Sequence, residues 1–229
     1  MNNVIVEIGK KELKTTFKSK SVILPMLLAI GIPLFALIPQ LSKAAAEGGL
    51  EGVYLILFML LLIPTVITSL VGMNAFLNEI KWRTIKSLLV APVSEKEIFV
   101  GKSLACIIAG LIVEACLTVV ILAFLPIPVN VPILITLLVI GPLLVMFATF
   151  LIISATSRFP SSVEGGAAAF IPVGGIMAVF LLCFFLQRLL KIDPTLTNIM
   201  IALIVAVLTF VIYIIATKWF NRERLVTGL

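Results

Sequence analysis

Residues 53–77 read VYLILFMLLLIPTVITSLVGMNAFL, a run without a single charged side chain. A helix needs about 20 apolar residues to cross the ~30 Å hydrocarbon core of a bilayer. Five other stretches of similar character occur in the chain, and the six predicted spans cover residues 21–39, 53–77, 102–125, 132–156, 165–186 and 198–217. The sequence therefore predicts an all-α integral membrane protein with six transmembrane helices.

The positive charges are distributed unevenly between the gaps that separate these spans. Of the 17 Lys and Arg residues, 14 lie before the first span, in or beside the connection after the second span, after the fourth span, or after the last one. The other three are Lys43, Arg188 and Lys191 in the alternate gaps. Because short loops rich in Lys and Arg stay in the cytoplasm, we expect both termini to be cytoplasmic.

The net charge of +6 follows from this asymmetry. A basic cytoplasmic face attracts anionic lipid headgroups, so we expect membrane lipid, and no nucleic acid, as its electrostatic partner. With 62% hydrophobic residues and short connections, the chain has no room for a second folded unit, and residues 1–229 are expected to form a single membrane domain.

Several chemical functions are disfavoured by composition. The chain has no His, which removes the commonest general base and zinc ligand, and its three Cys have no paired spacing. We therefore expect no catalytic residue and no metal site. Gly101, Lys102 and Ser103 imitate the end of a phosphate-binding loop, but Lys96 occupies the place of the loop's first glycine. No cofactor is expected in this chain.

The connection after the second span, residues 78–101, is the most specific segment. Its first half places apolar side chains at helical spacing and basic side chains on other faces, as in an amphipathic surface helix. The apolar positions are Trp82, Ile85, Leu88 and Leu89, and the basic ones are Lys81, Arg83 and Lys86. Pro92 ends this helix, and Ser94 with Glu97 has the spacing of a capping box that begins the next one.

This connection resembles the first cytoplasmic connection of the type-2 ABC (ABC-2) export permeases. In that family an acidic residue, a Gly-Thr pair, a Leu-Leu pair, Pro-Val-Ser, Glu-Ile and Gly-Lys follow in order. Arg83 stands where the family usually has glycine. The matching positions here are Glu79, Thr84, Leu88, Leu89, Pro92, Val93, Ser94, Glu97, Ile98, Gly101 and Lys102.

The two ends of the chain extend the resemblance. Residues 1–20 predict an interfacial helix, because apolar positions form a helical stripe opposite four lysines. It is similar to the elbow helix that opens these permeases, including Lys11, Glu12 and Leu13, and the tail at residues 219–225 resembles their aromatic and then basic ending. The stripe consists of Val4, Ile5, Ile8, Leu13 and Phe17, opposite Lys10, Lys11, Lys14 and Lys18.

The resemblance implies a half-transporter in the plasma (inner) membrane of a prokaryotic cell. Two permease units, identical or homologous, would form the pathway above two cytosolic ATPase subunits that bind ATP and Mg. ATPase closure would push on the coupling helix at residues 82–90 and on the elbow. The substrate, whether drug, lipid, peptide or ion, stays open.

Glu114 is the exceptional residue within the predicted spans. A carboxyl near the bilayer centre costs about 2.5–3.5 kcal/mol by insertion scales, and such residues usually face a bundle interior or water. Gly110 and Thr118 lie one turn to either side, forming a small and polar stripe suited to close helix contact. Two readings stay open: a residue facing the substrate route or the seam between permeases, and a carboxyl hydrogen-bonded to a neighbouring helix.

Prolines within the predicted spans interrupt helical hydrogen bonding, and we expect kinks or hinges near Pro25, Pro33, Pro64, Pro142 and Pro172. Gly174 and Gly175 follow Pro172 within one turn, so this cluster is the candidate hinge. Prolines are also common in membrane helices without a mechanical role.

Two rival classes of function remain. A secondary transporter or channel would use Glu114 as its ion site and need no ATPase, but the chain has neither an evident inverted repeat nor a second intramembrane acid. A membrane-embedded enzyme would need a nucleophile beside a base, which the sequence does not offer.

Overall fold

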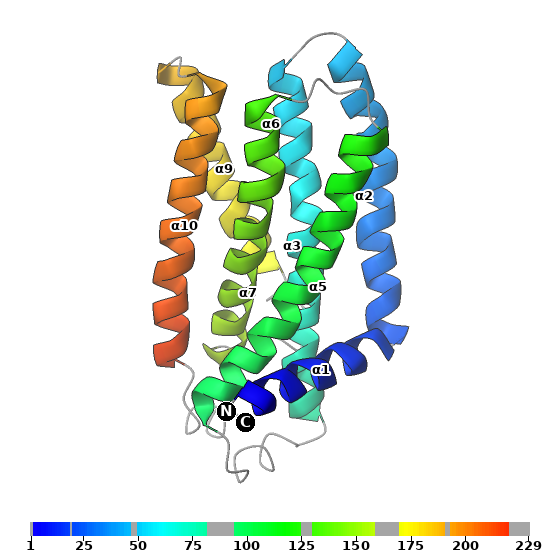
Figure 1. Ribbon diagram of the computed structural model, residues 1–229, viewed down its shortest axis with the longest axis vertical. Coiled ribbons are helices and arrows are strands. Elements are labelled where there is room, and N and C mark those ends of the chain that lie inside the picture. Colours follow the sequence, from blue (N-terminus) through cyan, green and yellow to red (C-terminus); the bar gives the residue numbers. More distant parts are fainter. Residues whose placement is uncertain are drawn as a thin grey trace.

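The computed structural model describes residues 2–18, 20–46, 50–81, 94–124, 130–158, 170–190 and 193–219. Every regular element in these ranges is helical, which confirms the all-α class, and α1 lies across one end of an upright bundle (Figure 1). The elements are α1 (Asn2–Lys18), α2 (Lys20–Ala46), α3 (Leu50–Lys81), α5 (Glu95–Phe124), α6 (Val131–Ile135), η1 (Thr136–Ile140), α7 (Gly141–Arg158), α9 (Phe170–Leu190) and α10 (Pro194–Trp219).

Among the described residues, five helical segments are long and apolar enough to cross a membrane. They are Met26–Ala46, Gly52–Ala75, Lys96–Ala123, Val131–Thr156 and Thr195–Lys218. The fifth predicted span, 165–186, begins outside the described residues, and the apolar part of α9, Ile171–Phe185, is shorter than the other five. The chain is thus a multi-pass membrane protein, while the total of six spans stays a prediction.

At the far end of the bundle, the end opposite α1, two helices extend beyond the predicted spans. The first span was expected to end at Pro39, but α2 continues to Ala46, and α3 begins at Leu50, so most of the expected connection is helical. The extension has a packing reason, because Leu41 lies fully buried in the core. A proline removes one backbone donor, and packing against neighbouring helices is sufficient to continue the helix past it.

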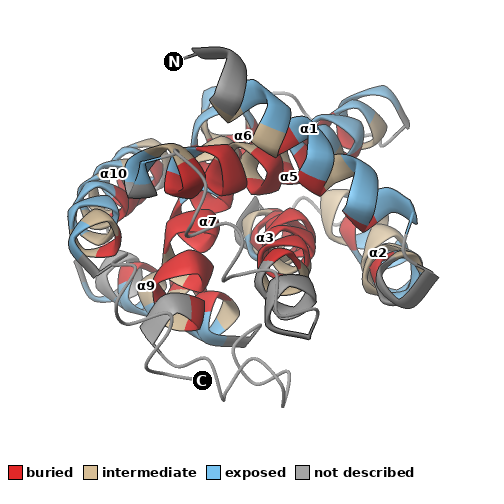
Figure 2. Ribbon diagram, turned by 90° about the horizontal axis from the view of Figure 1, so that it is seen from below, coloured by how far each residue is buried: buried red, intermediate tan, exposed pale blue. Residues whose placement is uncertain are grey.

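α3 occupies the centre of the bundle and packs against α2, α5, α7 and α9. Seen from the α1 end, buried residues concentrate on α3, α5 and α7, while exposed residues cover the outer faces of α1, α2 and α10 (Figure 2). The largest core cluster includes Leu57, Leu60 and Leu61 of α3, and Phe58 stacks on Phe180 of α9 with ring centroids 3.9 Å apart.

The fourth predicted span is one continuous helix with a wider turn inside it. α6, η1 and α7 follow without a break, and η1 is a π-helix in which the N–H of Gly141 bonds to the carbonyl of Thr136. Pro142 comes directly after this turn and has no N–H to donate. The expected interruption near Pro142 is therefore present, in the form of a π-bulge, a feature that is frequent at functional sites.

Candidate coupling site

The elbow helix α1 contacts the bundle mainly at the start of α5. The two helices cross where each has a glycine. A Cβ at position 101 would lie 2.9 Å from Cβ of Ile8, and a Cβ at position 9 would lie 3.4 Å from the backbone oxygen of Gly101. A side chain at Gly101 would have to push α1 away, so this glycine permits the close approach of the two helices.

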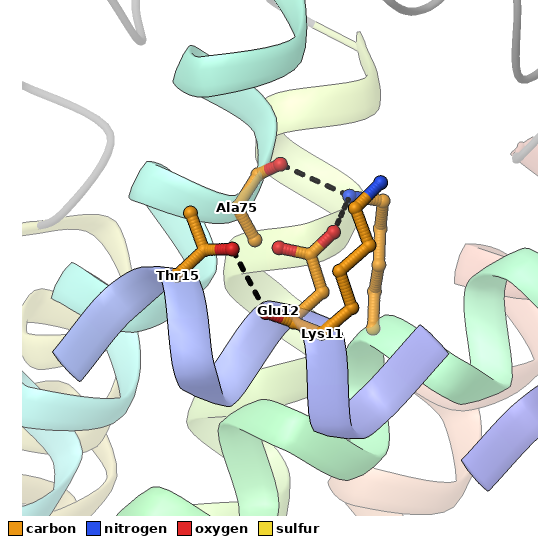
Figure 3. A network of polar contacts seen from close by, with 5 residues as sticks. Lys11, Glu12, Thr15 and Ala75 are labelled. Carbon is orange, nitrogen blue, oxygen red and sulfur yellow. Dashed lines mark hydrogen bonds and ion pairs between the residues drawn. The ribbon is translucent and has the colours of Figure 1, made fainter. Parts of the chain in front are cut away.

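A buried ion pair lies beside this crossing (Figure 3). Lys102, only 1% exposed, donates from Nζ to Oε1 of Glu12 at 3.1 Å and to the backbone oxygen of Ala75 at 3.0 Å. Glu12 belongs to α1, Lys102 to α5 and Ala75 to α3. One ammonium group therefore connects the elbow helix to both helices that flank the predicted coupling segment.

This arrangement differs from what the sequence predicted for both charged residues. Lys102 was grouped with the cations of the cytoplasmic connection, and Glu12 was named only as part of the match to the elbow helix. In the structure both are buried, as are Gly9 and Thr16 of α1, whereas Phe17 of the apolar stripe is 47% exposed. A signal was available, since Lys102 lies about two turns after the helix start marked by Ser94, too deep for a loop residue.

The capping box predicted at the start of the third span is present. The hydroxyl of Ser94 accepts a hydrogen bond from the N–H of Glu97 at 3.3 Å, and the Ser94 N–H donates to Oε2 of Glu97 at 2.8 Å. α5 begins at Glu95, directly after this cap. The cap fixes where α5 starts, and with it the depth at which Lys102 enters the bundle.

The remaining predicted coupling residues divide into two groups. Glu79 and Lys81 belong to the last turn of α3, which extends beyond the predicted end of its span at residue 77. The others lie outside the described residues: Trp82, Arg83, Thr84, Lys86, Leu88, Leu89 and Pro92.

Glu114 lies inside the bundle, between α5 and the junction of η1 with α7. It is 3% exposed, and its Oε1 accepts a hydrogen bond of 3.4 Å from the hydroxyl of Thr118. Oε2 has no hydrogen-bond partner in the part of the chain that the structure describes. A Cβ at position 141 would lie 2.6 Å from Cδ of Glu114, so the carboxyl rests directly on Gly141.

One turn before Glu114, Gly110 brings α5 against two other helices. A Cβ there would overlap the hydroxyl of Thr68 in α3 and lie 2.6 Å from Cγ1 of Val145 in α7. The stripe of Gly110, Glu114 and Thr118 thus faces the interior of this chain, where α3, α5 and α7 meet.

The candidate hinge lies near the described start of α9. Pro172 is buried, a Cβ at Gly174 would meet no atom within 4 Å, and a Cβ at Gly175 would contact the ring of Phe147 at 3.6 Å. These contacts fix the location of the cluster and leave its hinge role a prediction.

A second group of hydrogen-bonded polar side chains, which was not predicted from the sequence, connects helices at the end of the bundle opposite α1. The side-chain amide of Asn198 in α10 donates to the Pro132 carbonyl and the Thr136 hydroxyl, both at 2.9 Å. Asn130 caps α6 by accepting from the N–H of Ile133 at 3.3 Å, and the Tyr54 hydroxyl of α3 donates to the same Asn130 oxygen at 3.4 Å. An asparagine two residues before a proline is a recognisable helix start, and it could have revealed Asn130.

Comparison with known families decides between the classes left open above. The sequence model of the family described as "ABC-2 family transporter protein" matches residues 10–172. The chain belongs to this family. It is therefore the membrane subunit of an ABC transporter, a permease in an ABC-2 transporter rather than its ATPase. No curated protein matches the chain significantly.

The stretch matched to the ABC-2 family includes both buried groups of this permease. It contains Glu12 and Lys102 at the α1 end, and Glu114 with Gly141 in the middle of the bundle. α10 lies beyond the match, although it packs along α7.

Proposed function

We propose that this chain is the half-transporter of an ATP-driven exporter, in which a separate cytosolic ATPase binds ATP and Mg. Membership of the ABC-2 family supports this proposal. The single observation that carries the coupling role is the buried contact of Lys102 with Glu12 and Ala75, because it connects α1, α3 and α5 next to the segment where the ATPase would dock.

The proposed assembly contains two permease units, either two copies of this chain or this chain with a homologue. Both termini and the α1 end of the bundle would face the cytoplasm of a prokaryotic cell, with six helices crossing its plasma membrane. The clustering of 14 of 17 basic residues in the corresponding gaps supports this orientation.

The docking surface would be the basic face of the coupling helix. Reversing the charges of Lys81, Arg83 and Lys86 to Glu should weaken co-purification of the ATPase, because charged faces govern the encounter and register of such interfaces. Membrane insertion should be unchanged, since no span is altered. The measurement is the ATPase-to-permease ratio after affinity purification of the permease, together with ATP turnover.

The matched control reverses the three basic residues in the gaps that are expected to face away from the cytoplasm, Lys43, Arg188 and Lys191. An equal loss of ATPase in both variants would indicate a nonspecific charge effect. An unchanged ratio and unchanged turnover in the coupling-helix variant would remove the docking role assigned to it.

The alternative that the sequence left open, a secondary transporter or channel that uses Glu114, does not fit membership of the ABC-2 family. One observation favours it, namely the buried carboxyl oxygen that has no hydrogen-bond partner among the described residues. This class needs no ATPase. A neighbouring gene that encodes an ATPase with a phosphate-binding loop would therefore favour the exporter. Transport by the purified chain in vesicles without ATP would favour the secondary transporter or channel.

A further inference from the structure

The Glu12–Lys102 pair lies where the proposed coupling movement would enter the bundle. α3 ends at Lys81 and α5 begins at Glu95, so a push on the segment between them acts on the ends of both helices. Lys102 belongs to one of these helices and bonds to Ala75 of the other. The same ammonium group also bonds to the elbow helix through Glu12.

We propose that Glu12 and Lys102 are positioning residues that make α1, the start of α5 and the last turns of α3 move as one body when the ATPase closes. This inference rests on the proposed function. It assigns α1 a mechanical role, in which the elbow helix moves together with the ends of α3 and α5 rather than independently in the membrane surface.

Two features of the contact support a rigid joint. The glycine crossing leaves no gap between α1 and α5, since a Cβ at Gly101 would lie within 3 Å of Ile8. Packing of this kind resists compression, but two smooth helix surfaces can still slide along each other. The ion pair adds hydrogen bonds of defined length and direction, which fix the register of α1 along α5.

If the ion pair only stabilised the fold, a different experimental result would be expected. Removing one member of a buried pair leaves the other charge uncompensated, whereas replacing both by neutral side chains of similar size is often tolerated. The decisive variant is therefore Glu12→Gln/Lys102→Met. If the pair only stabilises the fold, this variant behaves like the parent; if the pair fixes the register, the variant assembles but loses the rigid joint.

The experiment measures distances between spin labels in the permease–ATPase complex in lipid nanodiscs, with and without ATP trapped by vanadate. One label pair joins α1 to the start of α5, at Lys14→Cys and Lys96→Cys, both exposed positions. The second pair joins Lys14→Cys to Leu196→Cys in α10. The exposed Cys116 is changed to Ser in all samples, while Cys106 and Cys183 are buried.

In the parent, the Lys14–Lys96 distance should stay unchanged on nucleotide trapping, while the Lys14–Leu196 distance shifts. In Glu12→Gln/Lys102→Met, the complex should retain its ATPase subunits. However, its Lys14–Lys96 distribution should broaden or shift with nucleotide, and its Lys14–Leu196 shift should shrink. The control Glu7→Gln/Lys10→Met makes the same chemical changes on the exposed face of α1 and should match the parent.

Two results would overturn the inference while leaving the proposed function intact. In the first, the Lys14–Lys96 distance of the parent itself shifts with nucleotide, a measurement that needs no joint variant to fold. In the second, the neutral variant keeps the distances and responses of the parent. If no ATPase assembles and nucleotide changes neither distance, the proposed function fails, and this inference fails with it.

Discussion

Replacing Gly141 by alanine would place a methyl group where the carboxyl of Glu114 lies. The added Cβ would be 2.6 Å from Cδ of Glu114 and 3.1 Å from its Oε2, well inside ordinary van der Waals contact. Overpacking costs about 1–3 kcal/mol, and because the displaced atoms are the flexible end of the Glu114 side chain, the cost here should lie near the lower end of that range. Alanine also favours a helix over glycine by about 0.5–1 kcal/mol, which offsets part of this cost.

A second glycine separates these two contributions. A Cβ at Gly31, in the middle of α2, would meet no atom within 4 Å, so Gly31→Ala reports the helix preference alone. The difference in free energy of unfolding between Gly141→Ala and Gly31→Ala should therefore equal the overpacking cost, about 1–3 kcal/mol. Both values can be measured by titrating the purified permease from mild detergent into a denaturing one and following its helical circular dichroism.

The third variant tests whether Glu114 is the group that is displaced. In a Glu114→Ala background the carboxyl is absent, and Gly141→Ala should then behave like Gly31→Ala. The double-mutant cycle should thus give a coupling energy of about 1–3 kcal/mol, as expected for residues in direct contact. If Gly141→Ala is as harmless as Gly31→Ala, or if its effect is additive with Glu114→Ala, the carboxyl does not rest on Gly141.

Two further predictions concern polar side chains inside the bundle. A double-mutant cycle of Asn198→Ala with Thr136→Val should give about 0.6 kcal/mol of coupling in the same unfolding assay, the usual value for one hydrogen bond between membrane helices, and no coupling would contradict that bond. For Glu114, the Gln variant should preserve assembly but alter transport-coupled ATP turnover, since it keeps hydrogen bonding and loses ionisation. The Leu variant should be tolerated only if the carboxyl merely packs, and parent-like behaviour of both variants would leave Glu114 without a transport role.

The helical segments were predictable because the bilayer imposes a length and an apolar composition on each crossing. The start of α5 was also predictable, since Ser94 and Glu97 satisfy backbone donors locally and need no tertiary contact. The end of α2 was not, because the residues after Pro39 are helical through the burial of Leu41 in a core that only the folded chain possesses. Capping residues and apolar runs therefore predicted where helices occur, whereas the end of α2 depends on tertiary packing.

The Glu12–Lys102 pair could not be predicted for a related reason. The two residues are 90 positions apart, and nothing in one sequence states that α1 crosses the start of α5. The positive-inside rule describes how a basic residue affects orientation and does not distinguish a solvated lysine from a buried one. Glu114 was recognised as exceptional from depth alone, but its contact with Gly141 depends on the packing of α5 against α7.

Hydrogen bonds that connect different helices occur at both ends of this bundle, whereas many hydroxyls between them bond within their own helix. Thr68, Ser69 and Thr149 each donate to the carbonyl four residues earlier, so these buried hydroxyls are satisfied without connecting two helices.

Lipid chains are as apolar as the side chains in the core, so the middle of the bundle depends on close fit for its stability. That fit depends on glycines at crossing points. A single methyl group at Gly141 is therefore a sensitive test of that fit, because no hydrogen bond between helices occurs at this position among the described residues. The glycines with the closest contacts to neighbouring helices are Gly72, Gly101, Gly110 and Gly141.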